Sequence, residues 1–308
     1  MTLNISLGIN TGFALNRYPT AEGWTRVVRE DLDLDTVQFT ADLLNASLPA
    51  DIIEAQILDV QKWCKKRKIT VEHTFTSAFT RVNHLSHPDP KIREYWIEWF
   101  KRFATISARL GATSMGSHFG ILGVDDLKDP ERRGRRLKEN IEGWHRIAAH
   151  AKNQGLKYLC WEPMSIPREY GETLEETRRI HQAVNDGISL PMKLCLDVDH
   201  GDVSSAHPDD TDPYAWLRTF GAESPIIHIK QSTKNKGGHW PFIKEINEQG
   251  RIQPDLVFSA LEESEAHDIL LLLELSFRER EPAESNMIMH LRESVEFWKK
   301  AIESYNSA

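Results

Sequence analysis

The chain is poor in cysteine, and the cysteines it has show no paired spacing. Its 308 residues contain three, Cys64, Cys160 and Cys195. This excludes a disulfide-stabilised secreted domain and a zinc site built on paired thiolates. Cys160 and Cys195 lie inside apolar, strand-like runs. The N-terminal stretch MTLNISLGIN also lacks the charged-then-apolar layout of a signal peptide. We therefore expect reduced, buried thiols and a cytoplasmic location.

Long apolar runs and an excess of positive charge are absent as well. No segment approaches the roughly 18 apolar residues that a membrane-spanning helix requires. The 46 acidic residues outnumber the 38 basic ones, so the formal net charge is -8. A net negative charge disfavours binding to the phosphate backbone of nucleic acids and to anionic membranes. We expect neither nucleic acid nor a membrane as a partner.

What recurs along the chain is a short β-rich run followed by a long amphipathic stretch. Helical spacing is clear in 91–110, 130–154 and 285–304. No linker or low-complexity segment interrupts the pattern, which predicts one domain over 1–308. Eight strand-like runs can be counted: 3–10, 35–41, 69–75, 112–118, 157–163, 192–198, 225–231 and 268–276.

Several of these runs are apolar on consecutive residues, as parallel strands buried on both faces are. Eight strand–helix units in about 300 residues are typical of a single (β/α)8 TIM barrel, an α/β fold. The alternative is a doubly wound open sheet, which usually carries a glycine-rich turn after its first strand. Here GINTGFALN has Gly8 and Gly12 but no phosphate-binding fingerprint. The pattern therefore favours the barrel.

Charged and imidazole side chains stand at the ends of six of these runs. In a TIM barrel the carboxyl ends of the strands meet at the active site. An isolated carboxylate in such a partly desolvated cavity costs several kcal/mol unless it is paired, protonated or bound to a metal. The residues are His73, His118, Glu162, Asp197, His200 three positions later, His228 and Glu274.

Four of these residues, Glu162, Asp197, His228 and Glu274, predict a metal site with three oxygen ligands and one nitrogen ligand. This mixture suits one divalent ion per chain, either Mn²⁺, Mg²⁺, Co²⁺ or Zn²⁺, since no thiolate takes part. Taken singly, a histidine in an apolar run is more often a hydrogen-bonded core residue. Four consecutive strands with such ends favour the metal site. His73 and His118 could bind a second metal or contact a substrate.

The motifs WEP (161–163), Asp197-x-x-His200, IIHIK (226–230) and LLLELS (271–276) resemble the xylose isomerase-like TIM barrels. Within that superfamily the chain is most similar to the ketose 3-epimerases. It looks closest to their small branch of tetrulose-phosphate racemases, the erythrulose-phosphate 3-epimerases of bacterial erythritol catabolism. The resemblance spans the whole chain in strand order. It implies a homodimer or homotetramer.

For the site, the resemblance implies that Glu162, Asp197, His228 and Glu274 hold Mn²⁺, Co²⁺ or Mg²⁺. It also makes Glu162 and Glu274 the catalytic acid/base pair and His200 a contact of the substrate oxygen. Two carboxylates facing a planar enediolate can invert one carbon, because one removes a proton and the other delivers one. An aldose–ketose isomerase would use the same intermediate and remains an alternative.

Basic residues after the last two strand-like runs are candidates for holding a phosphate. The stretch KQSTKNKGGHW (230–240) contains Lys230, Lys234, Lys236 and His239, and SFRER (276–280) adds Arg278. Loops after strands seven and eight of TIM barrels often bind phosphate. The lysines favour a phosphorylated ketose over a free sugar, although a solvated basic loop is the plain alternative.

Two rival functions remain open. Most of the strand-end set also resembles the zinc ligands of the endonuclease IV-type nucleases. Those enzymes need an Asp-x-His after the seventh strand, and here Gly237 stands two residues before His239. A catalytically inactive barrel that binds sugar is the other rival, and the retention of all four ligands speaks against it.

Overall fold

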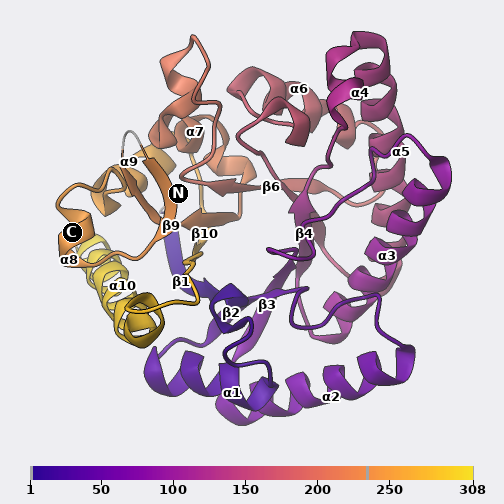
Figure 1. Ribbon diagram of the computed structural model, residues 1–308. Helices are drawn as coiled ribbons and strands as arrows, with labels where there is room; N and C mark the ends of the chain where they lie inside the picture. The colour runs from indigo at the N-terminus through magenta and orange to yellow at the C-terminus, as the bar shows by residue number, and fades with distance from the viewer. Residues whose placement is uncertain (1–2, 234–235, 308) are drawn as a thin grey trace.

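Eight parallel strands close into a barrel in the computed structural model, which describes residues 3–233 and 236–307 (Figure 1). Their order around the barrel is β1-β10-β7-β6-β5-β4-β3-β2, and β1 pairs with β2 to close it. This confirms the predicted barrel and excludes the open sheet. The strands are β1 (Asn4–Asn10), β2 (Thr36–Thr40), β3 (Thr70–Phe75), β4 (Ser114–His118), β5 (Tyr158–Glu162), β6 (Met192–Asp197), β7 (Ile226–Ile229) and β10 (Asp268–Leu273).

Helices between the strands form the outer ring (Figure 1). The three helices predicted from spacing are α3 (Pro90–Arg109), α5 (Pro130–Gln154) and α10 (Ala283–Asn306). Asp129 caps α5, whose first residue is Pro130, and Gly155 ends the helix at φ 93°. The others are α1 (Ala21–Arg26), α2 (Ala50–Arg67), α4 (Val124–Lys128), α6 (Leu174–Asn185), α7 (Pro213–Phe220), α8 (Lys244–Asn247) and α9 (Pro254–Glu263). Short turns of 3-10 or π helix are η1 (Thr11–Ala14), η2 (Val27–Asp31), η3 (Pro167–Glu169), η4 (Pro208–Thr211) and η5 (Gly221–Glu223).

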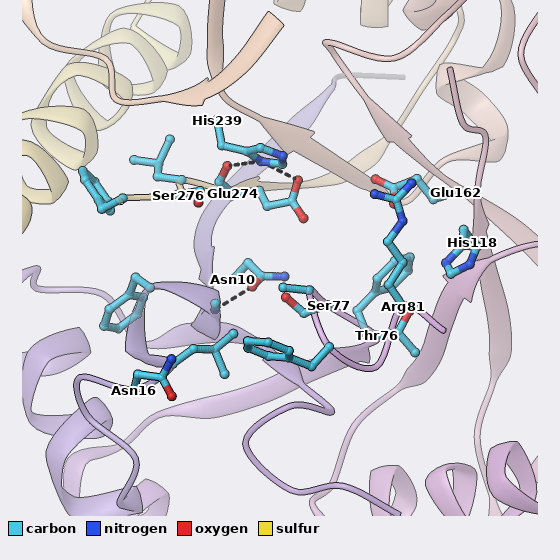
Figure 2. A pocket seen from close by; sticks show the side chains of 18 of the residues that line it. Asn10, Asn16, Thr76, Ser77, Arg81, His118, Glu162, His239, Glu274 and Ser276 are labelled. Carbon is cyan, nitrogen blue, oxygen red and sulfur yellow. Dashed lines mark hydrogen bonds and ion pairs between the residues drawn. The ribbon is translucent and has the colours of Figure 1, made fainter. Parts of the chain in front are cut away.

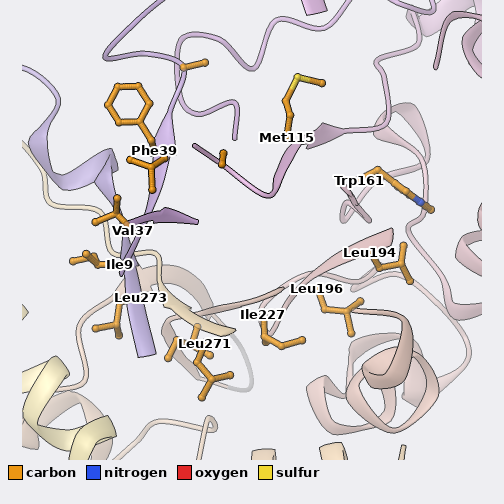
Figure 3. Close-up of a cluster of buried hydrophobic side chains, with 14 of the residues drawn as sticks. Ile9, Val37, Phe39, Met115, Trp161, Leu194, Leu196, Ile227, Leu271 and Leu273 are labelled. Carbon is orange, nitrogen blue, oxygen red and sulfur yellow. The ribbon is translucent and has the colours of Figure 1, made fainter. Parts of the chain in front are cut away.

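Alternation along the strands divides the side chains between two cores. Figure 3 shows one set, including Trp161, Leu194, Leu196 and Leu271, which belongs to the large cluster between strands and helices. A separate small cluster fills the barrel and contains Phe75, Cys160, Cys195, Ile226, Leu270 and Leu272. Successive side chains of a strand point to opposite faces. Residues two positions beyond Cys160, Cys195, Ile226 and Leu272 therefore also face inward, at the carboxyl end of the barrel.

The run predicted as one strand over 225–231 is two elements. β7 ends at Ile229, and β8 (Gln231–Thr233) then pairs antiparallel with β9 (Lys236–Trp240). Asp199 holds this hairpin over the barrel, because its carboxylate accepts the Gly238 N–H at 3.0 Å and pairs with Arg251 at 3.2 Å. The hairpin thereby places the residues after β7 beside the carboxyl ends of the strands. None of the helices in the described part of the chain is long and apolar enough to cross a membrane. The single domain over 1–308 stays a prediction.

Candidate metal centre and active site

The four predicted ligands meet at the carboxyl end of the barrel. Glu162 and Asp197 are the last residues of β5 and β6, His228 lies in β7, and Glu274 follows β10 directly. One ligand atom from each lies within 4.8 Å of the others. Nδ1 of His228 is 2.9 Å from Glu162 Oε1 and 3.7 Å from Glu274 Oε2. The two glutamates therefore flank one imidazole.

Gln38 of β2 fixes which nitrogen of His228 faces the carboxylates. Its buried Oε1 lies 2.8 Å from His228 Nε2 and 2.6 Å from Asn10 Nδ2. An amide oxygen can only accept, so Nε2 carries the proton and Nδ1 is the ligand atom. Burial acts to lower the pKa of His228, but Cys195, Glu274 and Glu162 together raise it well above its ordinary value. A cluster that uses Cys195 in place of Asp197 and Glu274 is also close enough. Burial raises the pKa of that thiol to about 11, which disfavours the thiolate.

Lys230 lies inside the cluster of ligands. Its side chain is 1% exposed, and Nζ is 2.5 Å from Asp197 Oδ2 and 3.2 Å from Glu274 Oε2. Burial acts to lower the pKa of Lys230, but Asp197 and Glu274 outweigh it and raise the pKa above its ordinary value. The ammonium group is therefore charged and committed to the carboxylates. This corrects the prediction that Lys230 binds the substrate phosphate: it does not line the cavity described below.

Two further histidines border the centre. His200 Nδ1 is 2.9 Å from the Pro163 carbonyl oxygen, to which it donates, and its Nε2 lies 3.6 Å from Asp197 Oδ2. His239 of β9 places Nδ1 3.4 Å from Glu274 Oε2. Both line the cavity. Their imidazoles therefore face the same cavity as the two glutamates. Contact of either with a substrate stays a prediction.

A cavity of about 490 Å³ opens above this centre (Figure 2). Its volume lies within the usual range for small-molecule sites. Asn10 from the end of β1 and Thr76 and Ser77 from the segment after β3 form its polar floor and wall. Glu162 and Glu274 face it from the metal-centre side. The cavity is thus lined by carboxylates on one side and by a polar wall from the loops after β1 and β3 on the other. The sequence patterns did not predict this polar wall.

His118 lines the cavity, and Arg81 lies at the same end (Figure 2). Burial lowers the pKa of His118 to about 3, with further contributions from the nearby charges of Arg81 and His200. His118 is therefore neutral. Its buried Nε2 has no hydrogen-bond partner among the described residues. Arg81 was missed from the sequence because it lies eight residues after the nearest strand-end histidine, His73, in a loop without regular spacing.

His73 does not reach the cavity. It lies in β3 two residues before Phe75, one layer deeper in the barrel, where Nδ1 contacts Ser114 Oγ at 2.5 Å and Nε2 contacts Tyr158 Oη at 3.2 Å. Burial lowers its pKa to about 3, with a smaller contribution from His228. His73 is a neutral, hydrogen-bonded core residue, which corrects the expectation of substrate contact. The metal-capable clusters of the described residues contain neither His73 nor His118.

The predicted phosphate loops are not gathered at the cavity. Arg278 is exposed and does not line it. Lys234 lies outside the described residues, and Lys236 is described only as the first residue of β9. The arginines that do line the cavity come from other loops, Arg17 after β1 and Arg81 after β3.

The donor set fits a divalent metal ion. Three carboxylates and one imidazole nitrogen are ligands typical of Mn²⁺, Mg²⁺, Co²⁺ and Zn²⁺. Asp197 and His228 are buried, and Glu162 is 7% exposed. Carboxylates this close in a desolvated place repel one another strongly unless cations lie between them. Glu162, Asp197, His228 and Glu274 are the residues that would hold the ion.

Comparison with known proteins agrees with this architecture. The family described as xylose isomerase-like TIM barrel matches residues 29–301. The chain is 42% identical over 301 residues to the D-erythrulose 1-phosphate 3-epimerase of Brucella abortus, covering 97% of each chain. A crystal structure from Rhodospirillum rubrum, provisionally named a xylose isomerase, shares 24% identity at a TM-score of 0.87, covering 96% of this chain and 99% of that one.

A second solved structure is more distant and agrees in fold. The D-psicose 3-epimerase of Clostridium cellulolyticum is 18% identical at a TM-score of 0.66, over 97% of this chain and 94% of that one. The match to the family covers well over half of the described barrel, from before β2 into α10. The chain belongs to the xylose isomerase-like TIM barrel family.

Proposed function

We propose that the protein is a divalent-metal-dependent epimerase that inverts the carbon next to the ketone of a small ketose phosphate, in particular a tetrulose (erythrulose) phosphate. The observation that carries the proposal is the pair of glutamates on either side of His228, at 2.9 Å and 3.7 Å from its Nδ1. The relative that is 42% identical bears the name of such an enzyme, which supports both the isomerase class and the substrate.

The glutamates supply the proton transfers. Inversion begins with one glutamate ionised and the other protonated. The ionised one removes the proton on the carbon beside the ketone, which leaves a planar enediolate. The protonated one then delivers its proton to the opposite face, so the two exchange protonation states and the reverse reaction can follow. A divalent ion held by the four ligands would supply Lewis acidity that makes this C–H bond more acidic.

His200 and the polar wall of the cavity would orient the sugar. With Nδ1 bound to the Pro163 carbonyl, His200 presents Nε2 toward the carboxylates, where it can accept a hydrogen bond from a substrate hydroxyl. Asn10 is held by Gln38 and lines the same cavity. A tetrulose phosphate has one stereocentre, so inversion at that carbon gives the mirror-image molecule.

The test is exchange with heavy water. The protein loaded with Mg²⁺ or Mn²⁺ is incubated with ketoses and ketose phosphates in D₂O, and the products are followed over time by NMR and chiral analysis. We expect deuterium at the carbon beside the ketone together with the opposite stereoisomer. An aldehyde product would identify an aldose–ketose isomerase instead. No exchange with any ketose phosphate would refute the proposal.

The remaining expectations belong to the same proposal. The three cysteines are free and buried, which fits a reducing compartment such as the cytoplasm. A homodimer or homotetramer stays a prediction, to be checked by light scattering of the purified protein.

A further inference from the structure

The cavity needs a positive group of its own if it is to hold a phosphate. Glu162, Glu274 and Glu279 line it, and a phosphate close to carboxylates requires a cation that is not already neutralised. Lys230 is bound to Asp197 and Glu274. The cationic side chains of lysine or arginine among the described lining residues are Arg17 and Arg81.

Arg17 is already bound by protein groups through two of its three guanidinium nitrogens, Nε and Nη2. Its Nε and Nη2 both bind the carboxylate of Glu284, at 2.8 Å and 2.6 Å, and Nη2 also donates to the Phe277 carbonyl oxygen at 3.0 Å. Its side chain is only 10% exposed. The guanidinium joins α10 to the loop after β10 and has little left to offer a ligand.

Arg81 is held in place but not saturated. Within the described residues its only partner is Glu169, which binds Nη2 and leaves Nε and Nη1 without protein partners. The side chain is 47% exposed, and Figure 2 shows it extending across the cavity toward Glu162. Nη2 has two N–H groups and Glu169 accepts one of them. One edge of the guanidinium, formed by Nη2 with either Nε or Nη1, therefore still offers two adjacent N–H groups for bidentate binding of a phosphate.

The loop that carries Arg81 is anchored at its tip. The carboxylate of Asp42 accepts the N–H groups of Phe79 at 2.9 Å and of Thr80 at 2.6 Å. The Thr80 hydroxyl in turn accepts the Ser77 N–H at 3.0 Å. These bonds fix the turn just before Arg81, so less entropy is lost when the side chain binds a ligand.

We infer that Arg81, from the loop after β3, binds the phosphate of the substrate and sets the preference for a phosphorylated ketose over the free sugar. The inference rests on the proposed function and moves the phosphate away from the loops after β7 and β10, where Arg278 lies. His118 lies at the same end of the cavity and has a buried Nε2 for which the described part of the chain offers no hydrogen-bond partner, so this end is polar.

The experiment compares the Mg²⁺-loaded wild type with Arg81→Met, the double variant Arg81→Met/Glu169→Gln and Arg278→Met. The double variant avoids leaving the Glu169 carboxylate unpaired, which guards against loss of folding. KM is measured for erythrulose phosphate and for free erythrulose, and binding of inorganic phosphate is followed by ³¹P NMR titration. We expect loss of Arg81 to raise KM for the phosphate about 10- to 150-fold, the range for a hydrogen bond to a charged group. KM for the free sugar should stay within about twofold, and Arg278→Met should behave as wild type.

An unchanged KM in both Arg81 variants, equal shifts for the two sugars, or a selective effect of Arg278→Met would overturn the assignment. Phosphate titration separates this inference from the proposed function. If the wild type turns over no ketose phosphate, the proposed function fails. Inorganic phosphate that binds the wild type and not the double variant would still support the subsite, whereas equal binding to both would overturn it.

Discussion

Replacement of Gln38 by leucine tests how the metal centre is oriented. Gln38 is buried, and its Oε1 accepts from His228 Nε2 at 2.8 Å and from Asn10 Nδ2 at 2.6 Å. Leucine removes the acceptor while nearly preserving volume. Asn10 Nδ2 then loses its acceptor, and His228 Nε2 keeps only the weaker contact with Cys195 Sγ at 3.4 Å. An unpaired buried donor costs about 1–3 kcal/mol, so the free energy of unfolding should fall by about 1–6 kcal/mol. The His228 ring also loses the bond that directs Nδ1 toward the glutamates.

The decisive measurement is metal affinity. Removal of a group that orients a metal-binding histidine typically lowers the affinity about 10- to 100-fold. Mn²⁺ is titrated into chelator-treated wild type, Gln38→Leu and Gln38→Glu by calorimetry, and urea unfolding checks that each variant is folded. Gln38→Glu keeps an acceptor at this place and should bind Mn²⁺ at least as tightly as the wild type. Wild-type affinity in a folded Gln38→Leu would refute the argument that Gln38 selects the ligand nitrogen.

Three further outcomes are expected. Glu274→Gln should fold normally yet lower kcat about 10²- to 10⁴-fold at saturating Mn²⁺, because it removes one proton-transfer group; kcat near wild type would contradict the two-glutamate scheme. Lys230→Met should bind Mn²⁺ at least about tenfold tighter, since it removes a positive charge beside Asp197 and Glu274. Weaker binding of Mn²⁺ in calorimetry would contradict this charge argument. Gly116→Ala should lower the free energy of unfolding by about 1–3 kcal/mol in urea titration, because a Cβ at 116 would overlap the Phe75 ring.

The fold and the meeting of the four proposed ligands at one place could be predicted because both follow from positions along strands. A buried run that ends in an acid or an imidazole places that side chain at the carboxyl end of the barrel, whatever the detailed packing. Glu162, Asp197, His228 and Glu274 all obey this rule. His73 shows its limit. It faces inward like the ligands, but Phe75 two residues later occupies the next layer and closes His73 off.

Lys230 could have been recognised from the same periodicity. It stands two residues after His228, so the two side chains face the same side, and it follows the strand end too closely to extend into a loop. Arg81 and Gln38 are different. The position of Arg81 depends on a turn anchored by Asp42, which lies 37 and 38 residues before the two residues whose N–H groups it binds. Gln38 matters through the hydrogen bond it makes across the barrel to His228. No local pattern in a single sequence carries such pairings.

The position of Lys230 gives the centre its charge balance. Glu162, Asp197 and Glu274 carry three negative charges when ionised, and the ammonium of Lys230 removes one of them, so the cluster is left with two. With all three carboxylates ionised, a doubly charged ion bound through a neutral His228 would bring the sum to zero, which is the state that a desolvated site favours most. With one glutamate protonated, as at the start of the inversion, the sum would be one positive charge. Without the lysine each of these sums would be lower by one charge, and the centre would be less favourable to a phosphate and to the growth of negative charge on an enediolate. On the proposed function, Lys230 therefore lowers the affinity of the centre for the metal ion and also reduces the electrostatic repulsion of an anionic substrate. On the same proposal, the lysine therefore belongs with the carboxylates, and Arg81 is the independent cation that we propose for the phosphate.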